Sequence, residues 1–497
     1  MLLFQNQLLN NPSGMKKINT LLLLIFVAAN LFAQTLVSDT ILLRLSKTDV
    51  DSLYTANGVP AFLFPTQYAV NVHRVIYNTL DGKNQPTVAS GLVVVPVGDT
   101  CPVPFISYQH GTQSKKDEVF SYLKGEWILG VAGAATGYLS CLPDYIGLGF
   151  SPGIHPYQHA ETEARAVVDI LRAAREIGVR EGLNLSEELF LLGYSQGGHA
   201  TMAAHREIEQ NLAGEFTVTA SAPLSGAYDM SGVQFDMVAS FDPYSVPGYL
   251  PFLIIGYQDV YGNLYSDISE IFTEPYDSIL PPLFDGNHTI GEVNDVMPSV
   301  PRLIIESAYA AAFFSDPQHP ALLALKDNDV YDWVPQAPVR MSYCEMDEEV
   351  SFLNAFVARD TMLARGATNV EIVNRSSTLG HFECARPSIL LTKFWFDSLA
   401  TASIFCSPTG IFSADIKNEQ LDIFPNPAKD VVQISFSNKE KENYTVFIAT
   451  SAGRIIKTIK NVTEDNVQVE TANLPRGIYI VLIRNGQKSH WGKLLKE

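Results

Sequence analysis

A run of four apolar residues, 189–192, leads directly into a serine flanked by glycines near the middle of the chain. The run continues as Gly-Tyr-Ser-Gln-Gly at 193–197, and a helical pattern follows from His199 to about Leu212. Glycine on both sides of the serine is typical of a sharp strand-to-helix turn in which larger side chains would clash. The pattern predicts that Ser195 is an exposed nucleophile beside helix amides that can hold an anion. A glycine-rich turn without chemistry is the alternative.

Short apolar runs alternate with helical patterns on both sides of this turn. Residues 161–177 predict an amphipathic helix, with Gly178 suited to its C-terminal cap. Buried strands alternating with helices indicate an α/β fold with a mostly parallel sheet covered on both faces. The expected strands are 68–77, 86–96, 103–108, 134–142, 189–192, 216–220, 339–344 and 370–373, and further helices are expected at about 47–54 and 388–401.

Two segments depart from this alternation. Residues 225–336 are rich in Pro and Tyr and are too long for a connecting loop, so we expect a large cap inserted over the site. An ordinary surface excursion is the alternative. Residues 406–418 are predicted to be a linker that follows a catalytic domain at 35–405. Seven short strands with turns then predict a small all-β sandwich at 419–497.

The N-terminal segment has the composition of a secretory signal. Lys16 and Lys17 precede an apolar core at 21–29, and 31–33 form a plausible cleavage site. We expect a signal peptide at 1–34, whose initiator could be Met15, and therefore a secreted or cell-surface protein. An N-terminal membrane anchor is the alternative, although the apolar run is too short to span a bilayer, and no other segment approaches that length.

The charge distribution narrows the choice of partners. The chain has a net charge of −19, and residues 419–497 contain 11 Lys and Arg against 9 Asp and Glu, which leaves about −21 for the rest. An acidic body of this kind argues against nucleic acid or an anionic membrane as the binding partner.

A serine nucleophile needs a base, and the base needs an orienting carboxylate, in the chain order Ser, acid, His. That order favours His381, which follows a strand and precedes the closing helix. Asp347 is the preferred acid on the loop after strand 339–344, with Glu345 and Glu348 as alternatives. The other histidines precede the serine (His73, His110, His155, His159), lie on the helix expected after Ser195 (His199, His205) or belong to the cap and terminal domain (His288, His319, His490).

An oxyanion hole requires two amides directed at the developing negative charge. The amide of Gln196, directly after the nucleophile, is one candidate. The second is expected from the loop after strand 103–108, where Thr112 or Gly111 supplies it. His110 in this loop is interpreted as a packing residue. No metal or cofactor is expected for this chemistry.

The motifs at 193–198, Gln-His-Gly-Thr at 109–112, Pro-Asp-Tyr-Ile-Gly-Leu-Gly at 143–149 and the spacing of Asp347 and His381 resemble secretory lipases of the fungal lipase A type. The resemblance covers about 68–401 and implies an α/β-hydrolase with a large helical cap. The acid loop departs from it, since such enzymes often have a glycine two or three residues before the aspartate.

The terminal segment is similar to the type IX secretion sorting domains of Bacteroidetes. The similarity rests on Phe-Pro-Asn-Pro at 424–427, Ala-Gly-Arg at 452–454 and Leu-Pro-Arg-Gly-Ile-Tyr at 474–479. It implies export across the outer membrane by the type IX machinery, usually with removal of the domain. A carbohydrate-binding or spacer sandwich is the alternative.

These features together predict a secreted carboxylic ester hydrolase, a lipase or esterase, that acts on a small-molecule or lipid ester through an acyl-enzyme. One alternative is a serine peptidase of the same fold, which would need paired acids to anchor a substrate amine. Glu345, Glu348 and Glu349 could serve in that role. The other alternative is a non-catalytic surface adhesin.

Five cysteines, 101, 141, 344, 384 and 406, follow the signal segment, and their spacings match no zinc pattern. Cys344 ends the strand before the acid loop, and Cys384 follows His381 by three residues. Contact between Asp347 and His381 would bring the two together, so we expect a disulfide between Cys344 and Cys384. Free buried cysteines are the alternative, and a 101–141 pair fits less well.

Overall fold

The computed structural model describes residues 35–59, 64–98, 101–401, 421–450, 455–485 and 489–497. The predicted signal peptide and the predicted linker lie outside these residues. No helix in the described ranges is long and apolar enough to cross a membrane.

Nine of the described strands form one sheet in the order β1-β2-β3-β5-β4-β6-β7-β8-β9. Neighbours from β1 to β5 pair antiparallel, and all pairs from β5 to β9 are parallel. The predicted α/β fold with a mostly parallel sheet is therefore confirmed. The strands are β1 (Leu36–Leu45), β2 (Ala69–Leu80), β3 (Pro86–Val97), β4 (Pro102–Gln109), β5 (Leu139–Pro143), β6 (Asn184–Tyr194), β7 (Thr217–Leu224), β8 (Val339–Cys344) and β9 (Val370–Ser376).

Helices cover both faces of this sheet. One face packs against α5 (Ala160–Arg180), α6 (Gln196–Asn211) and α13 (Leu353–Ala364), and the other against α3 (Lys47–Ala56), α4 (Ile128–Ala135) and α14 (His381–Leu399). Each helix contributes apolar side chains to its core, and burying one of these contributes about 1.5–3 kcal/mol. The two cores hold β6, β8 and α14 in fixed relation.

Several predicted boundaries were wrong. Residues 134–142 were expected to form one strand, but 128–135 form α4 and only 139–143 form β5, because a buried helix and a buried strand are equally apolar. Strand β1 was not predicted. Helix α5 continues through Gly178 to Arg180 instead of ending there, and α14 begins at His381 itself, seven residues before the predicted start.

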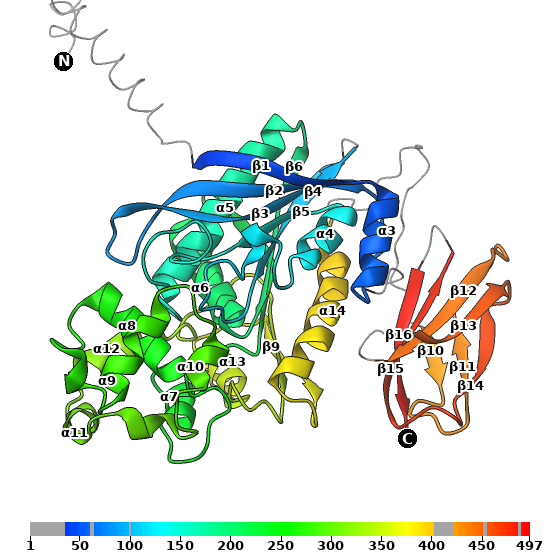
Figure 1. Cartoon of the computed structure of the whole chain (residues 1–497). Coiled ribbons are helices and arrows are strands. Elements are labelled where there is room, and N and C mark those ends of the chain that lie inside the picture. Colours follow the sequence, from blue (N-terminus) through cyan, green and yellow to red (C-terminus); the bar gives the residue numbers. More distant parts are fainter. Residues whose placement is uncertain (1–34, 60–63, 99–100, 402–420, 451–454, 486–488) are drawn as a thin grey trace, which may run out of the picture.

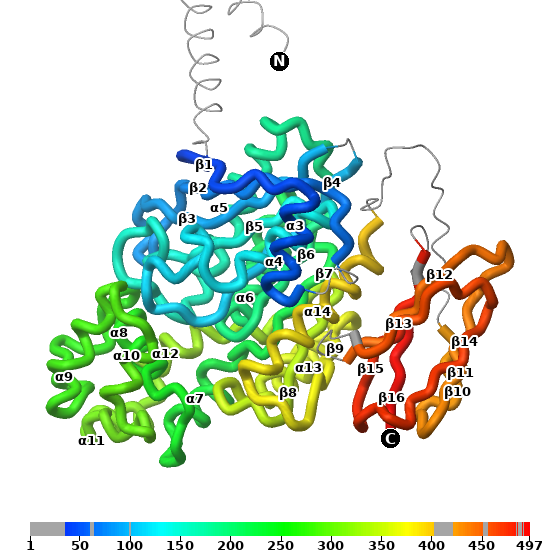
Figure 2. Tube along the Cα trace, turned by 45° about the vertical axis from the view of Figure 1, so that its right-hand side comes forward, coloured from blue at the N-terminus to red at the C-terminus, as the bar shows by residue number. Residues whose placement is uncertain are grey.

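Between β7 and β8 the chain forms short helices whose apolar side chains gather in two clusters, which also include Tyr157 and Val350. In Figures 1 and 2 these helices, in green, gather at one side of the molecule, apart from the terminal strands in orange and red. The helices are α7 (Val233–Val238), α8 (Tyr249–Tyr261), η2 (Ile268–Glu270), α9 (Tyr276–Ile279), η3 (Pro281–Phe284), α10 (Ile290–Asn294), η4 (Pro301–Ile304), α11 (Ser307–Ser315) and α12 (Pro320–Asp327). We refer to residues 225–336 as the cap segment.

The terminal residues form two small antiparallel sheets, β10-β11-β14 and β13-β12-β15-β16, around a shared apolar core. Apolar side chains alternate along β12, where Tyr444, Val446 and Ile448 face inward. The predicted small all-β domain is confirmed. Its strands are β10 (Asp422–Phe424), β11 (Val431–Ser435), β12 (Tyr444–Thr450), β13 (Ile455–Val462), β14 (Asn466–Glu470), β15 (Gly477–Arg484) and β16 (Ser489–Lys496).

A disulfide joins the end of β8 to the first turn of α14. Cys344 and Cys384 are bonded, with their Cα atoms 6.1 Å apart. Cys101 is also disulfide-bonded, whereas Cys141 is buried and free, which rules out a 101–141 pair. The bridge between Cys344 and Cys384 connects the end of β8, just before the acid loop, to the helix that begins with His381.

We predict that replacing Cys344 and Cys384 together by alanine lowers the free energy of unfolding by ~3–4 kcal/mol, because the bridge restricts the unfolded chain over a long loop. Chemical denaturation of the oxidised protein and the double variant measures this difference. Cys141→Ala is the control without a bridge. Equal stabilities of the double variant and the oxidised protein would contradict the prediction.

Candidate active site

The turn between β6 and α6 holds Ser195 in a backbone conformation that L residues rarely adopt. Ser195 has φ 61° and ψ −122° and forms the N-cap of α6. A Cβ atom added at Gly193 would lie 2.3 Å from the Gly197 carbonyl oxygen, and one at Gly197 would lie 2.0 Å from that of Gln109. Only glycine fits at these two positions, as the sequence pattern predicts.

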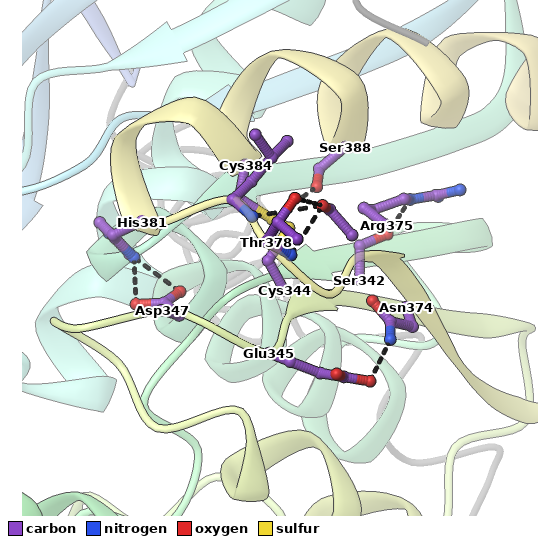
Figure 3. Close-up of a disulfide and its surroundings, with 12 residues drawn as sticks. Ser342, Cys344, Glu345, Asp347, Asn374, Arg375, Thr378, His381, Cys384 and Ser388 are labelled. Atoms are coloured by element: carbon purple, nitrogen blue, oxygen red, sulfur yellow. Dashed lines mark hydrogen bonds and ion pairs between the residues drawn. A yellow bond between two sulfur atoms is a disulfide. The ribbon is translucent and has the colours of Figure 1, made fainter. Parts of the chain in front are cut away.

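His381 and Asp347 are in direct contact (Figure 3). His381 Nδ1 lies 2.9 Å from Asp347 Oδ1 and 2.8 Å from Oδ2. The backbone amides of Glu349 and Val350 donate to Asp347 Oδ1 at 3.1 and 2.8 Å. Because both side chains are buried, this contact fixes the imidazole ring with its other nitrogen, Nε2, turned away from the carboxylate.

The charge around His381 is strongly negative. Burial acts to lower the pKa of His381, but the hydrogen bond and charge of Asp347, together with the charges of Glu349 and Glu348, outweigh it and raise the pKa above its ordinary value. The surrounding carboxylates therefore stabilise the protonated imidazole.

The residue before Ser195 brings the turn and His381 together. The Tyr194 hydroxyl donates to the backbone carbonyl of His381 at 2.5 Å, and the two rings lie 5.0 Å apart. Ser195, Asp347 and His381 are 7, 8 and 5% exposed. All three residues are therefore nearly buried, and the expectation that Ser195 is exposed is wrong.

The other acids of this loop are engaged differently. Glu345 points away and accepts from Asn374 Nδ2 at 2.5 Å (Figure 3). Glu348 Oε2 accepts the backbone N–H of His381 at 3.0 Å, at the N-terminus of α14, where a carboxylate is favourable. Glu349 Oε2 lies 3.8 Å from His381 Nε2. Of the acid loop, only Asp347 contacts Nδ1 of the histidine.

The loop after β4 passes directly beside Ser195. A Cβ atom at Gly111 would lie 3.7 Å from Ser195 Cβ, and the Thr112 hydroxyl donates to the Tyr157 hydroxyl at 3.1 Å. Gln196 is the first residue of α6, so its amide is among those that the helix leaves without an internal partner. Both predicted sources of oxyanion amides therefore flank the serine.

His110 in the same loop is held by packing. Its ring lies 5.1 Å from that of Phe120 and 4.4 Å from that of Tyr145. Its Nδ1 is 2.6 Å from the Gly111 carbonyl oxygen and its Nε2 is 3.2 Å from that of Asp144. These contacts agree with its interpretation as a packing residue.

A buried polar network lies under the turn and was not predicted. The Gln196 amide nitrogen Nε2 lies 2.8 Å from Glu163 Oε1 and 2.8 Å from His155 Nε2, and His199 Nδ1 lies 2.6 Å from Glu163 Oε2. Burial lowers the pKa of His155 to about 4, which keeps the ring neutral and able to accept from Gln196. Only the helical pattern around Glu163 marked this region in the sequence.

Within the described part of the chain, no group of three or more His, Cys, Asp and Glu side chains is placed to hold a metal ion. The arrangement instead combines a strained serine, a histidine oriented by a buried carboxylate, and backbone amides on two sides. Such a set of groups can transfer a proton and stabilise an oxyanion.

Comparison with known proteins gives two family matches. Residues 121–274 match the family described as secretory lipase, and residues 422–497 match the secretion system C-terminal sorting domain, of the type IX kind. The comparison with curated proteins finds no match.

Solved structures resemble most of the chain. The rice cell wall degrading esterase LipA from Xanthomonas oryzae, in a ligand-bound form, is 27% identical with a TM-score of 0.67, over 74% of this chain and 99% of that protein. A Legionella pneumophila protein described as a hydrolase is 27% identical with a TM-score of 0.68, over the same shares of 74% and 99%.

Candida antarctica lipase A in its closed state is 16% identical with a TM-score of 0.56, over 76% of this chain and 86% of that enzyme, and shares the fold. The matched sorting domain indicates a secreted or cell-surface location. Taken together with the secretory lipase match and the fold, these similarities show that the chain is a secreted carboxylic ester hydrolase with the α/β-hydrolase fold and a terminal sorting domain.

Proposed function

We propose that Ser195, His381 and Asp347 form a catalytic triad that hydrolyses carboxylic esters through an acyl-enzyme. Ser195 Oγ attacks the ester carbonyl while His381 Nε2 takes its proton, and His381 then gives that proton to the departing alcohol. Water then gives a proton to His381 Nε2 and attacks the acyl carbonyl, and the bond to Ser195 Oγ breaks as His381 returns the proton to that oxygen, which releases the acid. Asp347 holds the imidazole in one orientation and stabilises its protonated form.

The observation that carries this proposal is the contact between Asp347 and His381 beside the strained turn. His381 Nδ1 is occupied by Asp347 at 2.8 Å, so that Nε2 is the nitrogen left for proton transfer. Asp347 in turn is fixed by two backbone amides. The tyrosine preceding Ser195 binds the His381 backbone.

The amides of Gln196 and of Thr112 or Gly111 are proposed to hold the oxyanion. Gln196 is supported from below by Glu163 and His155, which keep the first turn of α6 in place. Gly111 lies so close to Ser195 that a substrate carbonyl bound at the serine would contact the loop that contains Gly111 and Thr112. Preorganised amides of this kind contribute several kcal/mol, about 2.7–4 for one donor in a related site.

The substrate class is proposed to be a small-molecule or lipid ester, with the cap segment over the site. The Xanthomonas oryzae relative is a rice cell wall degrading esterase, so cell wall esters are among the candidate substrates. The domain at 422–497 is proposed to direct the chain to the type IX secretion machinery.

A serine peptidase on the same fold would anchor the substrate amine with paired acids. Two of the three candidate acids already have partners within the protein. Glu345 accepts from Asn374, and Glu348 accepts from the backbone amide of His381. Parallel assays on esters and aminoacyl-arylamides separate the two activities, and labelling by a fluorophosphonate tests the alternative of a non-catalytic adhesin.

We predict that Ser195→Ala lowers kcat/KM on a p-nitrophenyl ester by at least about a thousandfold and abolishes fluorophosphonate labelling, because the nucleophile is lost. Ser225→Ala, at a buried serine after the neighbouring strand β7, is the control and should stay within about tenfold of the parent. Retained labelling in folded Ser195→Ala protein would disprove the nucleophile assignment.

We predict that Asp347→Asn lowers kcat/KM more than Glu345→Gln or Glu348→Gln, by about a thousandfold or more, because only Asp347 contacts Nδ1 of His381. Kinetic comparison of the three purified variants decides this. If either glutamate variant is the most damaged, the acid is not Asp347.

We predict that kcat/KM falls with decreasing pH through a midpoint above 6.5, the ordinary pKa of histidine, because the nearby carboxylates raise the pKa of His381. The base must be neutral to accept a proton, so activity is present above this pKa and is lost below it. Glu348→Gln should shift the midpoint to lower pH, and Glu345→Gln should not. A midpoint below 6.5 would refute the prediction.

A further inference from the structure

Glu349 is an acid that the triad does not use, yet it faces the nitrogen that the triad needs. Its Oε2 lies 3.8 Å from His381 Nε2, on the opposite side of the ring from Asp347. The side chain is 18% exposed, so it is partly open to whatever enters the site.

The cap segment holds this carboxylate in place. The Tyr249 hydroxyl, at the start of α8, donates to Glu349 Oε2 at 2.9 Å. The Glu349 backbone carbonyl accepts from the Tyr244 hydroxyl at 2.7 Å and from Gln234 Nε2 at 2.9 Å. Both the backbone and the side chain are thus fixed from outside the acid loop.

The position of Glu349 relative to Nε2 defines which part of a substrate it meets. During ester cleavage, Nε2 gives its proton to the departing alcohol oxygen, which must approach to about 2.6–3.2 Å. A carboxylate oxygen 3.8 Å from the same nitrogen therefore borders the alcohol and not the distant acyl chain. An ionised carboxylate accepts hydrogen bonds and cannot donate them.

The neighbouring side chains are aromatic with polar edges. The Tyr157 ring lies 5.6 Å from that of Tyr249, which lies 6.4 Å from that of Tyr244. Because Tyr157 also binds Thr112, these tyrosines form a continuous row from the oxyanion loop to Glu349. Rings of this kind combine an apolar face with a polar edge.

We propose that Glu349 is a specificity-determining residue that selects esters whose alcohol carries a hydroxyl or a cationic group close to the ester oxygen. The inference rests on the proposed function, because it requires that His381 Nε2 delivers the proton to the alcohol. The Glu349 carboxylate accepts a hydrogen bond from that hydroxyl, or attracts the cationic group, while the ester oxygen departs with the alcohol.

The test compares kcat/KM for 2-hydroxyethyl, 2-methoxyethyl and choline esters of butyric acid at mildly alkaline pH. The first two differ in one donor and have similar leaving groups. We expect the parent to favour the hydroxyethyl over the methoxyethyl ester by about tenfold, the usual effect of a hydrogen bond to a charged group. Glu349→Leu should remove this preference, and Glu349→Gln should reduce it.

Ratios for two substrates on one sample do not depend on the fraction of folded enzyme, so a partly misfolded Glu349 variant remains informative. Glu345→Gln, on the same loop but bound to Asn374, is the control and should keep both activity and preference. A preference for the choline ester that is lost in Glu349→Leu identifies the cationic group as the selected feature.

Equal turnover of the three esters by the parent, or a preference that Glu349→Leu leaves intact, overturns the proposal. Failure of the proposed function is distinct from this outcome. It would show as the absence of Ser195-dependent hydrolysis for all three esters and for p-nitrophenyl butyrate.

Discussion

Asp347 is a carboxylate removed from water, and the site is arranged around its stabilisation. A buried charge of this kind is unfavourable unless hydrogen bonds and an opposite charge compensate for it. Two amides of its own loop and the ring of His381 provide that compensation. The need to stabilise this buried carboxylate fixes the loop after β8 and the start of α14 relative to each other. Helix α14 in turn packs against the sheet, in which β6 leads directly into Ser195.

The features that could be predicted from sequence are those set by local pattern. The sharp turn at Ser195 could be predicted from the glycines on either side of it, because no larger residue fits at Gly193 and Gly197. His381 was expected to be the base from chain order, and the structure brings it into contact with Asp347. The choice of Asp347 among four neighbouring acids depended on position alone, and the structure distinguishes them by direction, with Glu345 turned outward. Helix α4 was misread because burial on all sides removes the amphipathic signal.

Contacts across long sequence separations could not be predicted in this way. Glu163 lies 33 residues before Gln196, and Tyr249 lies 100 residues before Glu349, so neither contact produces a local pattern in the sequence. The first contact links α5 to the residue after Ser195, and the second links the cap segment to the acid loop. The cap segment is therefore connected to the acid loop by hydrogen bonds, and a movement of α8 would be transmitted to the carboxylate beside His381.

The disulfide between Cys344 and Cys384 has a consequence for where the enzyme is completed. Disulfides form in oxidising compartments and are rare in a reducing cytoplasm. The bond between the acid loop and α14 is therefore expected to form only after the chain has left the reducing cytoplasm. The covalently bridged form of the molecule thus arises outside the cytoplasm.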